Sequence, residues 1–240
     1  MPRLSGRTLA ATTVASLVIA GLALVTLVQL VSLRCFDLIG DVVCDVRTEE
    51  PVVALTFTGG PSQAGVDAAL AALAAHNAKA TFFLRGKALE GNLAQARRLA
   101  QAGHEIGSAG YQRRVLVNLP QAEYRAEIDQ TDALLKEAGV EHTSLFRAPL
   151  GEKSVGLLWE LYKTGHALIL YDVSDTGQQL APPESYARSI VARAEPGSVI
   201  SLQVMGAQDA NARAALPLVL SGLREKGLQV VTVSELRSLD

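Results

Sequence analysis

The sequence has few of the residues on which metal sites and nucleic-acid interfaces depend. Its 240 residues include only four histidines and two cysteines. No two of the histidines lie three or four positions apart, so the chain has no local metal-ligand pattern. Residues 48–240 carry 18 basic and 21 acidic side chains. Without a positive excess, nucleic acid is not expected as a partner.

The two cysteines, Cys35 and Cys44, are nine positions apart. In an oxidising compartment they could pair with each other or join two chains into a dimer. Two unpaired thiols are the other alternative. No histidine lies near either cysteine in the sequence, so neither has the local pattern of a catalytic thiol.

A run of 26 residues without a charged side chain extends from Thr8 to Leu33. As a helix rising about 1.5 Å per residue, it can cross a hydrocarbon core of about 30 Å. A cleaved signal peptide is the alternative, because it also has a basic start and an apolar run. The length of the run, and the lack of a clean small-x-small site after it, favour a retained anchor.

The charges around this run predict its orientation. Arg3 and Arg7 precede it, and the positive-inside rule then places residues 1–7 in the cytoplasm and the rest of the chain outside. The sequence thus predicts a single-pass membrane protein with an anchor at 8–33, a stalk at 34–50 and one domain at 51–240. Disorder is expected near 46–50.

Beyond the stalk, short β-rich runs alternate with longer helical ones. The alternation predicts an α/β fold with a mostly parallel sheet, closed or nearly closed into a barrel. Helices are expected at 62–76, 95–102, 118–136, 154–163, 184–194 and 209–226, and Trp159 is expected in the core or between helices. The expected strands are 52–57, 80–84, 104–107, 144–146, 167–171, 198–202 and 228–231.

Five short motifs occur in order along this domain. They resemble motifs of the polysaccharide deacetylases, also called NodB-homology domains or carbohydrate esterase family 4. The resemblance implies a distorted (β/α)7-type barrel with its site at the carboxyl ends of the strands. The motifs are Thr56-Phe57-Thr58-Gly59-Gly60-Pro61, Ala80-Thr81-Phe82-Phe83-Leu84-Arg85-Gly86, Gly103-His104-Glu105-Ile106-Gly107, Phe146-Arg147-Ala148-Pro149-Leu150-Gly151 and Pro196-Gly197-Ser198-Val199-Ile200-Ser201-Leu202.

The resemblance fails at the positions that carry the family's chemistry. Thr58 stands in place of the aspartate base, and Gln203 in place of the histidine acid. Gly59, Ala109 and Arg113 stand in place of the metal-binding aspartate and two histidines. An amide does not deliver a proton near neutral pH, and none of the three replacements is a metal ligand of the family's type. We therefore expect no metal, no cofactor and no intact catalytic residue.

Two arginines are expected in the altered pocket. Arg147 matches the family arginine that pairs with the catalytic aspartate, and Arg113 occupies a histidine position. They are candidates for binding an anion, unless Arg113 pairs internally with Asp172 or Asp175. Tyr111 completes the candidate pocket. The motif positions lack the family's tryptophans, so glycan affinity is expected to be low.

The sequence leaves three functions open. The first is a catalytically inactive, membrane-anchored protein that binds a glycan or an anionic envelope polymer outside the cytoplasm. The second is an active hydrolase of amide or N-acetyl bonds in polysaccharide or peptidoglycan, using other groups such as Asp172, Asp175 and Glu105. The third is a structural partner or scaffold that binds neither glycans nor anions.

Overall fold

The computed structural model describes most of the chain from residue 39 onward. The predicted anchor at 8–33 lies almost wholly outside the described residues, as do the predicted cytoplasmic end and His142. Within the part that is described, no helix combines the length and hydropathy needed to cross a bilayer. The described residues are 39–141, 143–178, 180–206 and 208–239, with Ile19, Gly21, Leu22, Val25 and Cys35.

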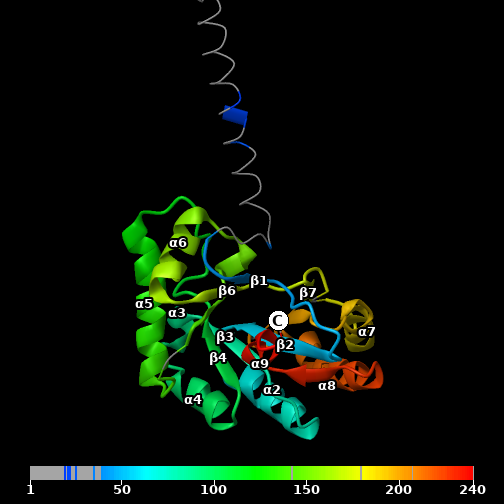
Figure 1. Ribbon diagram of the computed structural model, residues 1–240. Helices are drawn as coiled ribbons and strands as arrows, with labels where there is room; N and C mark the ends of the chain where they lie inside the picture. The colour runs from blue at the N-terminus through cyan, green and yellow to red at the C-terminus, as the bar shows by residue number, and fades with distance from the viewer. Residues whose placement is uncertain are drawn as a thin grey trace, which may run out of the picture.

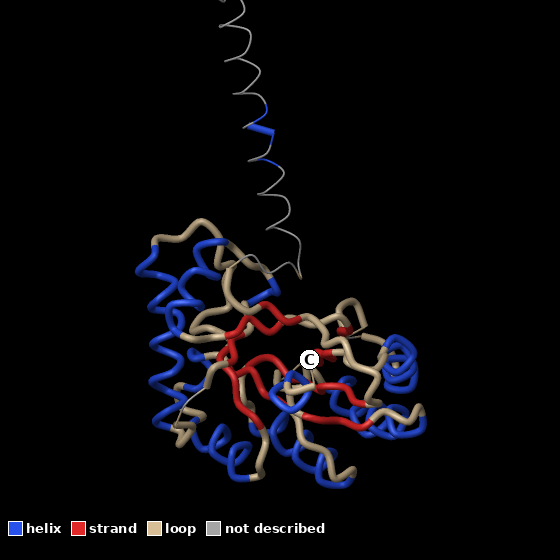
Figure 2. The backbone as a smooth tube through the Cα atoms, viewed as in Figure 1, coloured by secondary structure: helices blue, strands red, loops and turns tan. Residues whose placement is uncertain are grey.

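One curled sheet of parallel strands forms the centre of the domain (Figure 2). Its order is β1-β6-β5-β4-β3-β2-β8-β7, and β9 pairs with the start of β2. Every strand pair in it is parallel. The strands are β1 (Val42–Val43), β2 (Val52–Gly59), β3 (Thr81–Leu84), β4 (Glu105–Ser108), β5 (Leu145–Phe146), β6 (Ala167–Ile169), β7 (Val173–Ser174), β8 (Val199–Leu202) and β9 (Gln229–Val231).

The seven predicted strands all occur, but the barrel is more open than predicted. Among the described residues the sheet path ends at β1 and β7, which do not pair with each other, so the sheet is a curled half-barrel. These two strands were not predicted from the sequence. Each has only two residues.

Helices cover the outside of the curled sheet (Figure 1). Helix α2 begins where predicted, because the Ser62 hydroxyl accepts a hydrogen bond from the Gly65 N–H at 3.2 Å. The helices are α2 (Gln63–Ala75), α3 (Gly86–Leu89), α4 (Leu93–Gln101), α5 (Gln121–Glu137), α6 (Val155–Thr164), α7 (Pro183–Arg193), α8 (Ala210–Glu225) and α9 (Val233–Arg237), with a 3-10 turn at Pro149–Gly151.

Two local expectations are wrong. The segment at 46–50 is not disordered: Val46 is buried, and its N–H donates to the Gly197 carbonyl at 3.0 Å. Trp159 is 49% exposed instead of lying in the core. Helix α6 turns Leu157, Leu158 and Leu161 inward, which leaves position 159 on its outer face.

The cysteines form a disulfide within the chain. Cys35 and Cys44 are joined, with their Cα atoms 5.7 Å apart. The alternative of two unpaired thiols is therefore wrong. Because both sulfurs are used in this bond, neither is left to join two chains, and the structure gives no support to a dimer bridged through Cys35 or Cys44.

Candidate functional site

A pocket of about 700 Å³ lies at the carboxyl ends of the central strands. This is the edge of a parallel α/β sheet at which ligands commonly bind, because the loops that follow neighbouring strands converge there. The described wall carries three arginines and one aspartate, a net charge of +2. The residues that follow strands β2, β3, β4, β5, β6 and β8 on this wall include Gly60, Arg85, Ala109, Arg113, Arg147, Tyr171 and Gln203.

The five positions that the motif resemblance singled out in the sequence all line this one pocket. They are Thr58, Gly59, Ala109, Arg113 and Gln203. The set spans 146 positions of the sequence, and only the folding of the sheet brings it together. The structure thus places at one site the residues that the motif comparison singled out separately.

These side chains do not suit a catalytic divalent metal. Thr58 offers a neutral hydroxyl, Gly59 and Ala109 offer no donor atom, and Arg113 brings a positive charge. Zinc sites in proteins use thiolates, imidazoles and carboxylates, whose coordinating atoms carry a lone pair and no proton. In the described part of the chain, no group of three or more such side chains could hold a metal ion.

The backbone at Gly59 adds a second obstacle. Its φ angle is +140°, a conformation that side-chain-bearing residues rarely adopt. The aspartate that the family has at this position would be strained here. At the end of β2 the main chain, as well as the side chains, is therefore unsuited to an aspartate ligand.

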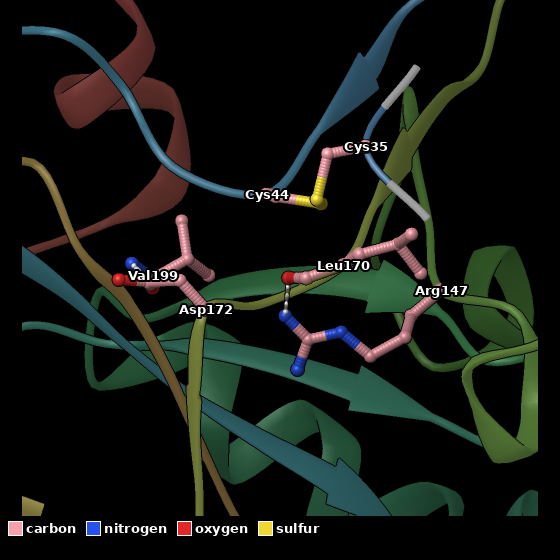
Figure 3. The surroundings of a disulfide bond; sticks show 6 residues. All are labelled: Cys35, Cys44, Arg147, Leu170, Asp172 and Val199. Atoms are coloured by element: carbon pink, nitrogen blue, oxygen red, sulfur yellow. Dashed lines mark hydrogen bonds between the residues drawn. A yellow bond between two sulfur atoms is a disulfide. The ribbon is translucent and has the colours of Figure 1, made fainter. Parts of the chain in front are cut away.

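Arg147 is held by a dense set of hydrogen bonds at the base of the pocket. Its side chain is buried, with 1% exposed. Nη1 donates to the hydroxyls of Thr56 at 2.7 Å, Thr58 at 3.0 Å and Ser201 at 3.2 Å. Nε and Nη2 donate at 3.0 Å to the carbonyls of residues 169 and 170. Figure 3 shows the bond to Leu170.

The acceptors in these five bonds are neutral oxygens. Arg147 therefore reaches position 58, where the resemblance implies an aspartate, but meets a hydroxyl there. The guanidinium also lies over the ring of Phe83, 4.0 Å from its centroid, which stabilises the cation. Because these donors are bonded to protein oxygens, Arg147 forms the floor of the pocket and is poorly placed to bind a ligand.

Two predicted pocket residues, Asp172 and Asp175, do not line the pocket. Asp172 accepts hydrogen bonds from Ser198 Oγ and Val199 N, and Figure 3 shows it beside Val199. Burial raises the pKa of its carboxyl group. Neither aspartate pairs with Arg113, so that predicted internal pairing is not formed.

Asp175 supports the pocket from behind. It is 1% exposed and accepts hydrogen bonds at 2.9 Å from the Tyr186 hydroxyl and the Gln203 N–H. Burial raises the pKa of Asp175, and these two bonds only partly oppose the shift. Asp175 thereby fixes the backbone at Gln203, which does line the pocket.

Tyr111 also points elsewhere, although its backbone belongs to the loop that carries Arg113. Its hydroxyl donates to Glu90 outside the described pocket wall. The loop is fixed by Glu127, whose carboxylate accepts hydrogen bonds from the N–H groups of Tyr111 and Gln112 at 2.7 and 2.8 Å. Glu127 is 3% exposed.

Sequence reasoning missed Glu127 and Arg85. Glu127 lies on the buried face of α5 with Tyr124, Ile128 and Thr131. An acid at an apolar position of helical spacing was the signal that could have found it. Arg85 directly follows β3, at the carboxyl edge where a site was expected.

The three carboxylates suggested for a non-standard enzyme, Asp172, Asp175 and Glu105, do not come together in the pocket. Glu105 begins β4, where it accepts hydrogen bonds from Thr81 Oγ1 and Ser234 N. It therefore lies at the opposite end of its strand from the pocket. His104 precedes it, and burial lowers its pKa to about 4, so this imidazole is neutral near pH 7. It packs against Phe82 and has a structural role.

Comparison with known proteins agrees with this architecture. The sequence profile of a family described as polysaccharide deacetylase matches residues 45–169, just over half of the chain. The chain is 28% identical over 200 residues to a peptidoglycan-N-acetylglucosamine deacetylase of Bacillus cereus. That match covers 82% of this chain and 93% of the relative.

Solved structures show the same fold. The structure of the Bc1960 peptidoglycan N-acetylglucosamine deacetylase is similar with a TM-score of 0.78 and 26% identity, over 82% of this chain and 92% of the other. Wild-type BA3943, a CE4 family pseudoenzyme from Bacillus anthracis, is similar with a TM-score of 0.77 over 85% of this chain and 70% of the other. At 22% identity, this second likeness concerns the fold alone.

Proposed function

Because this chain belongs to the polysaccharide deacetylase family, we propose that it keeps the family's pocket without the metal-dependent reaction and acts as a binding module for a cell-envelope glycan. One observation carries the proposal. The five positions that would supply base, metal ligands and acid converge on one pocket, and none offers the required group. Loss of one general acid or base commonly costs 10²–10⁴ in rate, so loss of the whole set leaves little catalysis.

A glycan is the ligand class that the family membership supports. The Bacillus cereus relative acts on N-acetylglucosamine of peptidoglycan, and the pocket of about 700 Å³ is in the size range of sites for small ligands. Tyr171 is the aromatic side chain on the described wall. With so little stacking surface, the affinity for a neutral sugar should be weak.

We place this module outside the cytoplasm on a membrane anchor at 8–33. The uncharged run and the two arginines before it support the anchor. The disulfide between Cys35 and Cys44 supports an oxidising compartment, because such bonds are rare in the cytosol. Membrane fractionation of cells, with thiol labelling before and after reduction, tests both points.

Metal content and acetate release from the full-length chain test the loss of the reaction. The Bacillus cereus relative, purified and treated in the same way with zinc, is the positive control. We expect substoichiometric zinc in this chain and acetate release from chitooligosaccharides at least about 10³-fold slower than in the control. Stoichiometric zinc, or a rate comparable with the control, would refute the proposal.

A further inference from the structure

Two arginines on the pocket wall have no counter-charge among the described residues. Arg85 follows β3 and is half-buried, and Arg113 lies exposed in the loop after β4. Neither guanidinium donates a hydrogen bond or forms an ion pair within the described part of the chain. Burial lowers the pKa of the Arg85 guanidinium, and the nearby positive charge of Arg113 is the second cause of this shift.

The acidic residues near Arg85 and Arg113 interact with other groups. Glu123 and Glu127 each form an ion pair with Arg114 at 2.7 Å. Glu90 pairs with Lys87 at 2.6 Å. The carboxylate on the described pocket wall, Asp209, accepts the Gly206 N–H at 2.6 Å. The one carboxylate on the described wall does not cancel the charges of its three arginines, so the wall stays positive.

The backbone holds the two segments together. The N–H of Gly86 donates to the Gly110 carbonyl, and that of Lys87 to the Tyr111 carbonyl, both at 2.9 Å. The N–H of Arg85 donates to the Gly59 carbonyl at 3.1 Å. Together with the bonds from Glu127 to the loop, these contacts fix the positions from which both guanidinium groups extend. Two like charges on one pocket wall favour an anion, and preorganisation reduces the entropy lost on binding.

We propose that Arg85 and Arg113 together bind the carboxylate or phosphate group of an anionic saccharide held in the pocket. A guanidinium presents a planar fork of N–H donors that matches either oxyanion. The net charge of +2 on the described wall favours such a ligand over a neutral sugar. The saccharide part of this inference rests on the function proposed above.

Three sugars that differ only at C6 provide the test: glucose, glucuronate and glucose 6-phosphate. Binding to the full-length chain is measured by NMR titration at low ionic strength. We expect at least one charged sugar to bind about tenfold more tightly than glucose, equivalent to about 1.4 kcal/mol. The two charged sugars distinguish carboxylate from phosphate. R85Q/R113Q should remove the preference, and about 0.15 M salt should reduce it.

R188Q is the matched control. Arg188 is exposed on α7, outside the pocket wall, and has no hydrogen bond or ion pair with the described residues. It should keep the preference for charged sugars. The inference is overturned if glucose binds as tightly as both charged sugars, or if R85Q/R113Q retains the preference. Acetate release would contradict the loss of catalysis without touching this result, so the two failures can be told apart.

Discussion

At the scale of single residues, Arg147 shows how a charge can be buried beside neutral groups. Five of its hydrogen bonds go to three hydroxyls and two carbonyls. We expect R147M to lower the free energy of unfolding by about 3–5 kcal/mol, because it leaves these buried acceptors without donors. T58V, which removes one of the bonds, should cost about 1 kcal/mol. Urea denaturation followed by circular dichroism measures both. A loss below about 1 kcal/mol for R147M would show that the guanidinium contributes little.

Asp175 makes stability depend on pH in a direction that can be derived. Burial raises the pKa of the Asp175 carboxyl group above the ordinary 3.8. At a pH between 3.8 and this raised pKa, Asp175 is protonated in the folded protein and ionised in the unfolded chain. The free energy of unfolding then falls as the pH rises from 3.8 to the raised pKa. D175N, which can still accept from Tyr186 and Gln203, should lack this fall. The difference between D175N and wild type, measured by urea denaturation across this range, isolates Asp175. A difference independent of pH would contradict the shift.

The pocket positions that lie in motifs could be predicted from the sequence. The residues outside the motif departures that line or brace the pocket could not. The five substituted positions follow from matching short strings around Gly and Pro, and they do meet in one pocket. Arg85 and Glu127 act through contacts that only the fold creates, and no motif departure drew attention to them. Asp172 and Asp175 were misplaced because the chain after β6 and after β7 directs their side chains to Ser198 and Tyr186 instead of into the pocket.

At the scale of elements, the stalk is joined to the domain by a turn that requires glycine. Gly197 has φ +84°, and a Cβ there would lie 1.8 Å from the Val46 carbonyl oxygen. We expect G197A to cost at least about 3 kcal/mol, since the stalk must move and lose its hydrogen bond to this turn. Gly139 has φ +88° with nothing near its Cβ position, so G139A should cost only about 1–2 kcal/mol. Equal losses in thermal or urea unfolding would show that the stalk contact adds nothing.

Prediction of strands succeeded where the apolar run in the sequence was long. It failed where the order of a segment depends on contacts with residues far away in the sequence. The apolar runs of β2, β3 and β8 are buried along nearly their whole length, which makes them visible in the sequence. The segment at 46–50 contains Arg47, Thr48 and two glutamates, which gave no sign of order. Its order comes from Val46 docking on Gly197, a contact between positions about 150 residues apart.

At the scale of the whole molecule, the curled sheet preserves a family frame around a cationic pocket. The sheet brings together loops from six strands, and hydrogen bonds among the main chain, Glu127, Asp175 and Arg147 maintain their arrangement. None of these supports requires a metal. A pocket of this kind can therefore change its ligand without a change of fold, which is consistent with fold and function being separable.

Restoring the family's residues should restore metal binding at a cost in stability. We expect T58D/G59D/A109H/R113H/Q203H to bind about one zinc per chain, measured by elemental analysis, because the frame still brings the five positions to one pocket. The zinc-free variant should unfold about 1–3 kcal/mol more easily, since the aspartate introduced by G59D must adopt the strained φ of +140° or shift the end of β2. T58D/Q203H, which adds no metal-ligand set, is the matched control and should bind no zinc. If the quintuple variant binds no more zinc than this control, the backbone differs too much from a metal-binding geometry for side-chain changes alone to create the site.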